Sequence, residues 1–388
     1  MKFQVAKSDL DAAIALVSNS ISAAPDISGH YVFRPVSGNP GRMEVRTYSG
    51  RLSSGCPFVA TVDGDGEFTV EGKRLKAFLG SVDDGVLTFE ADSKGTISIV
   101  APGMGTQHFQ GLDPTPFPHW DALLSKAKLT ATMPAARLAE ALSYARPFAA
   151  TDEAKTPHLC VCEAREGVMA SSNAAFGAGV YLFVPLLKNA SVRVHVKDTG
   201  ALLAFLGQID GDVNIWETER VAFYVRADGA IFGESRLNVE YPKIKVPPVA
   251  DAHWWTIDVA RALKALPFLK SGASEENLRI HLSRPDPDGP VKFAMLSKTG
   301  KVSEVEVACS ASGKVDNAKE LSTGGFHVGY NPLLKMLELH RDQPEITIGI
   351  NPLPPIGGYL RVVDDKFKAE GSDGSDADQY ITIVAWLK

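Results

Sequence analysis

The chain has 388 residues, of which 45% are apolar and 22% are charged, and its formal net charge is −6. The length predicts two or three domains, and the composition is typical of a globular protein. The sequence contains no run of 18 apolar residues and no secretory leader, so we expect neither a membrane span nor export. The negative charge by itself argues against a nucleic-acid partner, although the distribution of charge matters more than its sum.

The chain opens with a strand and a helix, because MKFQV reads as a short strand and the next stretch is rich in Ala and Leu. A second pair begins at residues 68–70, which alternate before an amphipathic helix containing Leu75, Phe78 and Leu79. Asp and Gly turn residues and further strands follow. The unit ends at Phe117-Pro118, where proline fixes an extended exit for the residue before it.

The same order returns later in the chain. AFLGQIDGDVNIW at residues 204–216 matches AFLGSVDDGVLTF at residues 77–89 in six of thirteen positions. Further strand-and-helix pairs begin near residues 127, 253 and 326, and repetition of this kind indicates a repeated structural unit. We therefore predict an α+β chain of three domains, with boundaries that give residues 1–122, 123–250 and 251–388. In the last helix we expect Asn331 as N-cap and Pro332 as first residue, and Pro267 should kink or shorten the fifth helix.

Two other segments have a plainer interpretation. AEGSDGSDADQ at residues 369–379 is predicted to be an acidic, solvated hairpin loop. Four scattered cysteines suggest reduced thiols in a cytoplasm rather than a disulfide framework. The run HLCVCEA places His158 near Cys160 and Cys162, but no second cluster supplies a fourth ligand, so we expect no metal and no cofactor.

Positive charge concentrates on the six predicted helices, which carry a net charge of +6, while the rest of the chain carries −12. Because the repeat puts these helices in equivalent positions, we expect a shared basic face that attracts a polyanion. The alternative is that Lys and Arg, as good helix formers, simply cover exposed helix faces. No aromatic residues interleave with them, so contact is expected with backbone phosphates and without sequence preference.

In its order of motifs the chain resembles the bacterial DNA polymerase III beta subunit, the sliding clamp. The resemblance rests on MKFQV at the start, the three copies, the pairs Phe117-Pro118 and Tyr241-Pro242, and the final apolar strand. It implies three tandem DNA-clamp domains, with antiparallel sheets outside and two helices per domain inside, in a head-to-tail homodimeric ring. It also implies a processivity factor that encircles double-stranded DNA, tethers a DNA polymerase and catalyses nothing.

The resemblance assigns residues to three sites. The DNA-facing residues of the inner helices are Lys73, Arg74, Lys76, Arg137, Arg146, Lys197, Arg261, Lys264, Lys335 and Arg341. A pocket between domains two and three, which takes short peptide motifs of the DNA polymerase and clamp loader, comprises Pro157, Ser171, Asn173, Ala174, Ala175, Phe176, Pro242, Lys245, Val246, Ile383, Val384, Ala385 and Trp386. The dimer interface comprises Phe109, Phe268 and Leu269, for which the alternative is the core of their own domain.

The chain departs from the family pattern in three places. The usual Thr-Asp-Gly-His-Arg-Leu run is replaced by residues 171–176, without its His and Arg, and IVAW replaces the usual Met-Pro-Met near the end. Ala24 stands where an arginine is expected after the first helix. We therefore expect a diverged clamp whose pocket persists as an apolar groove with an altered peptide preference.

A second hypothesis is a ligand-binding protein or enzyme built on a repeated α+β domain, with its site in an inter-domain cleft. A concentrated polar cluster in one cleft would favour it, whereas basic residues scattered over equivalent helix positions favour the clamp. GMGTQ at residues 103–107 lacks the lysine and the helix of a phosphate loop. No Ser, His and Asp set occurs in the context of a nucleophile elbow.

Overall fold

The computed structural model describes residues 1–173, 178–236, 240–242, 253–273, 278–286, 288–296, 300–312, 325–353, 357–364 and 380–387. The chain divides into two compact units, Met1–Glu140 with Asn189–Asn238, and Ala141–Lys188 with Val239–Lys388. The boundaries between these two units fall inside the predicted second domain, residues 123–250, and residue 250 lies outside the described residues. The division into three domains therefore remains a prediction.

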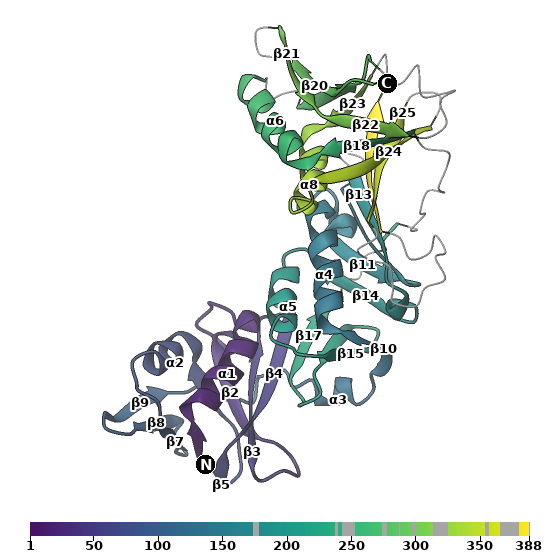
Figure 1. The fold of residues 1–388 in the computed structure, drawn as a ribbon. Helices are drawn as coiled ribbons and strands as arrows, with labels where there is room; N and C mark the ends of the chain where they lie inside the picture. Colours follow the sequence, from purple (N-terminus) through teal and green to yellow (C-terminus); the bar gives the residue numbers. More distant parts are fainter. Residues whose placement is uncertain are drawn as a thin grey trace. The chain divides into compact units, whose positions relative to one another are not determined.

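The first unit contains two antiparallel sheets (Figure 1). The five-stranded sheet has the order β5 (Thr61–Asp63), β1 (Lys2–Ala6), β7 (Val86–Ala91), β8 (Thr96–Ala101) and β9 (Gly105–Gln110). The eight-stranded sheet has the order β10 (Lys128–Pro134), β15 (Asp212–Glu217), β16 (Val221–Val225), β17 (Ile231–Ser235), β4 (Leu52–Val59), β3 (Arg42–Tyr48), β2 (His30–Pro35) and β6 (Phe68–Glu71). Strands from distant parts of the sequence therefore meet at β17 and β4, where Gly233 lies opposite Ser53.

Amphipathic helices cover these sheets. In α1 (Lys7–Val17), Leu10, Ile14 and Val17 recur at helical spacing and are buried where the helix packs on β3 and β4. Figure 1 shows α1 near α5 (Thr199–Leu206), and the two helices are in contact. The helix α2 (Gly72–Leu79) follows β6 directly, so the predicted strand-then-helix pairs at residues 2–17 and 68–79 are confirmed.

The second unit repeats this arrangement. One run of neighbouring antiparallel strands is β11 (Val161–Arg165), β12 (Val168–Asn173), β13 (Ala178–Phe183), β26 (Tyr380–Leu387), β25 (Gly357–Asp364), β24 (Glu345–Leu353), β18 (His253–Asp258) and β22 (Cys309–Ser312). A second run, joined to β26, is β23 (Phe326–Gly329), β19 (Arg279–Ser283), β20 (Val291–Leu296) and β21 (Val302–Val307). The helices α6 (Val259–Gly272) and α8 (Tyr330–Leu339) share one apolar core with these strands.

The strand order itself repeats. The sequence β10-β15-β16-β17-β4-β3-β2 in the first unit corresponds step for step to β18-β24-β25-β26-β13-β12-β11 in the second. The order β1-β7-β8-β9 matches β10-β15-β16-β17, and β23-β19-β20-β21 matches β6-β2-β3-β4. The internal repeat that the sequence predicts is therefore confirmed in the topology of the sheets.

The start of the last helix was predicted wrongly, and the proline of the fifth helix does not shorten that helix. The helix α8 begins at Tyr330 with Gly329 as N-cap, two residues earlier than predicted, because the Tyr330 amide donates to the Leu278 carbonyl at 2.9 Å. The helix α6 runs past Pro267 to Gly272. Buried residues lie on both sides of the proline, Ala262 before it and Leu269 after it among them, and their packing outweighs the hydrogen bond that proline removes.

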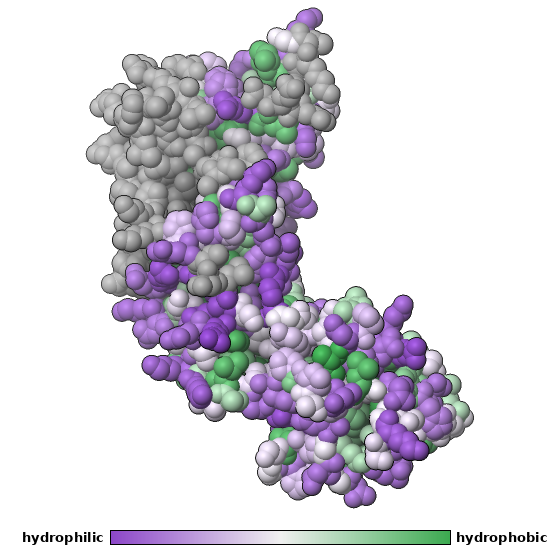
Figure 2. All heavy atoms as spheres, turned by 180° about the vertical axis from the view of Figure 1, so that it is seen from behind, coloured by the Kyte–Doolittle hydropathy of each residue, from purple (hydrophilic) through white to green (hydrophobic). Residues whose placement is uncertain are grey.

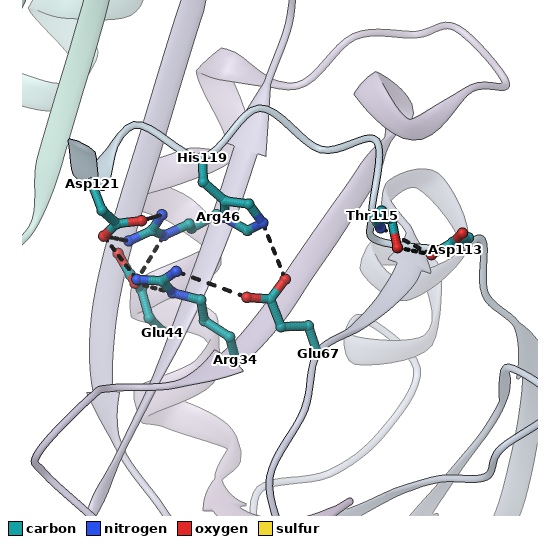
Figure 3. A network of polar contacts seen from close by, with 8 residues as sticks. All are labelled: Arg34, Glu44, Arg46, Glu67, Asp113, Thr115, His119 and Asp121. Atoms are coloured by element: carbon teal, nitrogen blue, oxygen red, sulfur yellow. Dashed lines mark hydrogen bonds and ion pairs between the residues drawn. The ribbon is translucent and has the colours of Figure 1, made fainter. Parts of the chain in front are cut away.

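An ion-pair network holds the segment after the five-stranded sheet (Figure 3). Asp121 begins the short α3 (Asp121–Leu124) and accepts hydrogen bonds from Arg46 at 2.7 Å and from Arg34 at 2.8 Å. Glu44 lies 2.9 Å from Arg46 Nε and 3.1 Å from Arg34 Nε, and the Arg46 guanidinium lies 4.4 Å from the Trp120 ring centroid. The segment at the predicted boundary between residues 122 and 123 is thus anchored to β2 and β3.

The remaining described elements are one α-helix, one strand and five short 3-10 helices. They are α4 (Ala135–Ala145), β14 (Ser191–His195), η1 (Ser18–Ser20), η2 (Ile27–Gly29), η3 (Arg146–Phe148), η4 (Pro157–Leu159) and η6 (Pro185–Leu187). None of the described helices is long and apolar enough to cross a membrane. In Figure 2, hydrophilic residues cover much of the described surface on this side, with smaller hydrophobic patches between them. Several large apolar side chains are exposed, Phe268 and Leu296 among them.

Candidate nucleic-acid interface and partner site

Most of the basic residues assigned to the helices are exposed. These are Lys73, Arg74, Lys76, Arg146, Lys197, Arg261, Lys264 and Arg341. In α2, Leu75 and Leu79 are buried while Lys73 and Lys76 are exposed, so the helix turns its basic residues away from the core. The same holds in α6, where the exposed Arg261 and Lys264 alternate with the buried core positions.

Lys335 and Arg137 are half-buried and have local partners. The Lys335 ammonium donates to the Pro147 carbonyl in η3, and burial lowers the pKa of this lysine. Arg137 donates to Glu140 at 2.9 Å, three residues further along the same helix. Lys335 therefore has a structural role in the second unit besides any contact with a polyanion.

The backbone brings two of the segments assigned to the partner pocket into one sheet. Asn173 of β12 lies opposite Ala178 of β13, and Ala178 lies opposite Val384 of β26. Ile383 lies opposite Gly179 in the next position. Residues 171–173 and the terminal strand that contains residues 383–386 are therefore separated by one strand only.

The residues assigned to the pocket differ in their burial, and some of them lie outside the described residues. Ser171 is buried, and its hydroxyl donates to the Ala145 carbonyl at the end of α4, while Asn173 is half-buried. Pro157 and Pro242 are exposed. Five assigned residues, Ala174, Ala175, Phe176, Lys245 and Val246, lie outside the described residues, as does the acidic loop at residues 369–379.

Two strands, β9 and β21, each lie at the end of a run of paired strands among the described residues. The outer edge of β9 ends the five-stranded sheet, and the outer edge of β21 ends the run β23-β19-β20-β21. Phe109 of β9 is buried against Phe78, with ring centroids 5.8 Å apart, and Leu269 is buried in the core of the second unit. Phe268 is 64% exposed, which is unusual for a large aromatic side chain.

Sequence analysis missed several residues that bear on these surfaces. Leu296 and Val302 are about as exposed as Phe268, at 60% and 59%, and lie on β20 and at the start of β21. The alternation in VSEVEV signals a half-buried strand, but it does not tell that this strand ends a sheet. The ion pairs around Asp121 also went unpredicted, since Arg34, Arg46 and Asp121 are far apart in sequence.

The described residues contain no group of three or more His, Cys, Asp and Glu side chains arranged to hold a metal ion. Cys160 and Cys162 are buried, and His158 lies half-buried in η4. Burial raises the pKa of the Cys56 thiol to about 12 and that of Cys309 to about 11, so neither is a ready nucleophile at neutral pH.

No family model and no curated protein matches the sequence. The structure, however, is similar to solved sliding clamps along its whole length. The DNA polymerase sliding clamp from Bacillus subtilis has a TM-score of 0.78 at 13% identity, and the one from Pseudomonas aeruginosa has 0.78 at 15%. The DNA polymerase III beta subunit from Thermotoga maritima has 0.75 at 14%. Each match covers 100% of this chain and 99% of the other. The α+β sliding-clamp fold that the sequence resemblance implies is confirmed.

Proposed function

We propose that this chain, which has the fold of DNA polymerase III beta subunits, is a sliding clamp: a non-enzymatic processivity factor. The observation that carries the proposal is the likeness over the full length of both chains, because a clamp needs every domain to complete a ring. In this proposal the three domains comprise residues 1–122, 123–250 and 251–388.

The repeat of strand order supports closure into a homodimeric ring. Within the chain, β17 pairs antiparallel with β4, and β26 pairs antiparallel with β13. By the correspondence of strand orders, β9 is the counterpart of β17 and β26, and β21 is the counterpart of β4 and β13. We therefore pair β9 of one copy with β21 of a second, a head-to-tail contact that closes after two subunits. The exposed Phe268 and the buried Phe109 and Leu269 are assigned to this contact.

The exposed basic helix residues support a role in binding duplex DNA. The protein has a net charge of −6, so a general affinity for polyanions is not expected from its total charge. The basic groups on the helices would attract phosphates in the hole of the ring, and contacts without base recognition allow sliding. The ten assigned residues, from Lys73 to Arg341, are the DNA-facing groups of this proposal.

Partner proteins are assigned to the sheet around β12, β13 and β26. The register that sets Asn173, Ala178 and Val384 in one row supports a groove at this sheet. The groove of the proposal is built from Pro157, Ser171, residues 173–176, Pro242, Lys245, Val246 and residues 383–386. In the proposal, this groove takes a short peptide of the DNA polymerase or the clamp loader. Since the family's His and Arg are absent here, the peptide preferred by this groove differs from the usual one.

Retention on DNA tests the proposal. The protein, loaded by its host's clamp loader on nicked circular DNA, should stay bound on gel filtration and be lost once the DNA is cut open. A variant with Glu at Lys73, Lys76, Arg146 and Lys264 should fold as the wild type, because all four side chains are exposed, and dissociate faster. Equal loss from circular and linear DNA would contradict topological binding, and unchanged retention of the variant would contradict the inner-face assignment.

A further inference from the structure

The first unit has a second basic surface, away from the helix residues assigned to DNA. A cleft of about 690 Å³ opens where β10 begins, β15 ends and β16 begins. We call it the basic cleft. It is lined by Leu123, Lys126, Lys128, Thr130, Glu217, Thr218, Glu219, Arg220 and Arg236. Its volume lies in the range of ordinary ligand sites, about 300–1,000 Å³.

The floor of the basic cleft is a fixed polar network. The Arg236 guanidinium pairs with the Glu217 carboxylate and donates to the Ser191 carbonyl at 2.7 Å. The same carboxylate accepts from the Thr130 hydroxyl at 2.8 Å and from the Ser191 amide at 2.9 Å. Glu217 is therefore neutralised and its hydrogen bonds are satisfied. Arg236 Nε is buried and has no hydrogen-bond partner among the residues that the structure describes.

The walls of the basic cleft carry cations without counter-charges. Lys126, Lys128 and Arg220 are exposed, and in the described part of the chain no carboxylate forms an ion pair with any of them. Glu219 is the one acidic lining residue besides the neutralised Glu217. On a protein with a net charge of −6, this makes the cleft locally positive.

The geometry of the cleft wall is preset. The Thr218 hydroxyl accepts from the amides of Arg220 at 3.2 Å and Val221 at 2.9 Å, which fixes the turn between β15 and β16. The Arg236 amide donates to the Arg220 carbonyl at 2.7 Å, so the side chains of these two arginines start from neighbouring positions of the backbone. A ligand therefore meets charges that are already placed, which reduces the ordering entropy of binding.

Another cleft of the same unit is acidic, so a positive lining is not common to the clefts of this unit. A cleft of about 550 Å³ is lined by four carboxylates, those of Asp65, Glu67, Asp92 and Asp113, with Lys94 and the amino terminus as its cations. The two clefts therefore differ in the charge of the ligand that each one favours.

We propose that the basic cleft binds a short acidic peptide segment of a partner protein, with an apolar side chain next to its carboxylates. The carboxylates would pair with Lys126, Lys128 and Arg220, and the apolar side chain would lie on Leu123, which is 39% exposed. A nucleic acid fits less well, because a continuous row of phosphates would approach Glu219 and leave Leu123 unused. The site shares no residue with the proposed DNA-facing surface or partner groove.

Fluorescence anisotropy tests this on the free chain, independently of ring closure or loading. The probe is a fluorescein-labelled twelve-residue peptide of Asp, Leu, Gly and Ser, compared with a peptide in which Asn replaces each Asp. The acidic peptide should bind at least tenfold more tightly than its Asn counterpart, and its affinity should fall between 50 and 300 mM NaCl. Lys126→Gln, Lys128→Gln and Arg220→Gln together should weaken binding at least tenfold.

The control variant combines Lys94→Gln, Lys155→Gln and Lys188→Gln, three exposed lysines outside the basic cleft, and changes the net charge equally. It should bind the acidic peptide as the wild type does, and both variants should show the wild-type melting curve. Binding that is equally weakened in both variants, or unchanged in the cleft variant, overturns the proposal. So does a failure of the acidic peptide to bind, or cleft-dependent binding of a dT12 oligonucleotide in its place.

Discussion

Replacement of Asp121 by Asn removes the carboxylate that anchors the segment after the five-stranded sheet. Asp121 accepts two hydrogen bonds of 2.7 Å from Arg46 and one of 2.8 Å from Arg34. The Arg46 side chain is only 3% exposed. In the variant the Arg46 charge is left with Glu44 alone, a carboxylate that already pairs with Arg34. Arg34 keeps a second partner, Glu67, at 3.8 Å.

The expected loss follows from burial. Removal of one partner of a fully buried ion pair costs about 3–5 kcal/mol. Because the Asp121 side chain is 50% exposed, we expect a loss of about 2 kcal/mol, or roughly a 30-fold change in the unfolding equilibrium. Urea unfolding followed by tryptophan fluorescence measures this, since Trp120 lies over Arg46. With a slope of about 2 kcal/mol per molar urea, the midpoint should fall by about 1 M.

The same variant has a pH signature. Hydrogen bonds from Arg46 hold the pKa of Asp121 well below its usual range. A carboxyl group with a depressed folded-state pKa contributes stability above its unfolded pKa, about 3.9, and that contribution is lost as the pH falls toward the folded-state value. The difference between wild type and Asp121→Asn should therefore be complete at pH 7 and shrink below about pH 4.

Asp113→Asn is the matched control, because Asp113 lies in the same segment and accepts hydrogen bonds only locally, from Thr115 (Figure 3). This exposed substitution should change the free energy of unfolding by less than about 1 kcal/mol. An equal loss in both variants, or no loss in Asp121→Asn, would refute the argument that the buried arginine decides the effect.

Three further predictions concern other sites. Burial raises the pKa of Glu234 well above its usual range, so the folded state keeps a proton that the unfolded state releases, and stability falls as the pH rises. Glu234→Gln should therefore flatten the decline in melting temperature between pH 5 and pH 8, and an unchanged slope would argue against this. Lys335→Met should destabilise the second unit by about 1–3 kcal/mol, because the Pro147 carbonyl loses its hydrogen-bond donor. Lys264→Met, at an exposed position, should not, and equal denaturation curves for both variants would show that the Lys335–Pro147 hydrogen bond does not stabilise the unit. Phe268→Asp should halve the native mass, and Leu186→Asp, at a similarly exposed position, should leave the mass unchanged. A two-chain mass for Phe268→Asp would exclude Phe268 from the interface.

Local signals in the sequence predicted the elements well, since the alternation and the three-and-four spacing that mark β6 and α2 depend on neighbouring residues only. Charged positions opposite an apolar stripe face away from the core, as Lys73 and Lys76 do in α2, but Arg137 and Lys335 are half-buried. The start of α8 was missed because the Tyr330 amide that fixes it donates to the carbonyl of Leu278, more than fifty residues earlier.

Non-local contacts explain the remaining gaps. The pairing of β17 with β4 joins residues about 180 positions apart, and no local pattern specifies such a partner. Hydrophobicity alone does not separate Leu269, a core residue, from its exposed neighbour Phe268, because the helix register decides which of them faces inward. The basic cleft likewise combines residues 123–130 with 217–236 and exists only in the folded chain.

Closure of two copies into a ring through β9 and β21 can be tested by native mass and electron microscopy of the same sample. We expect a mass of about 83 kDa, twice the 41.6 kDa of one chain, and a closed ring with a sixfold outline. A monomer without a hole, or an open filament of many copies, would contradict it.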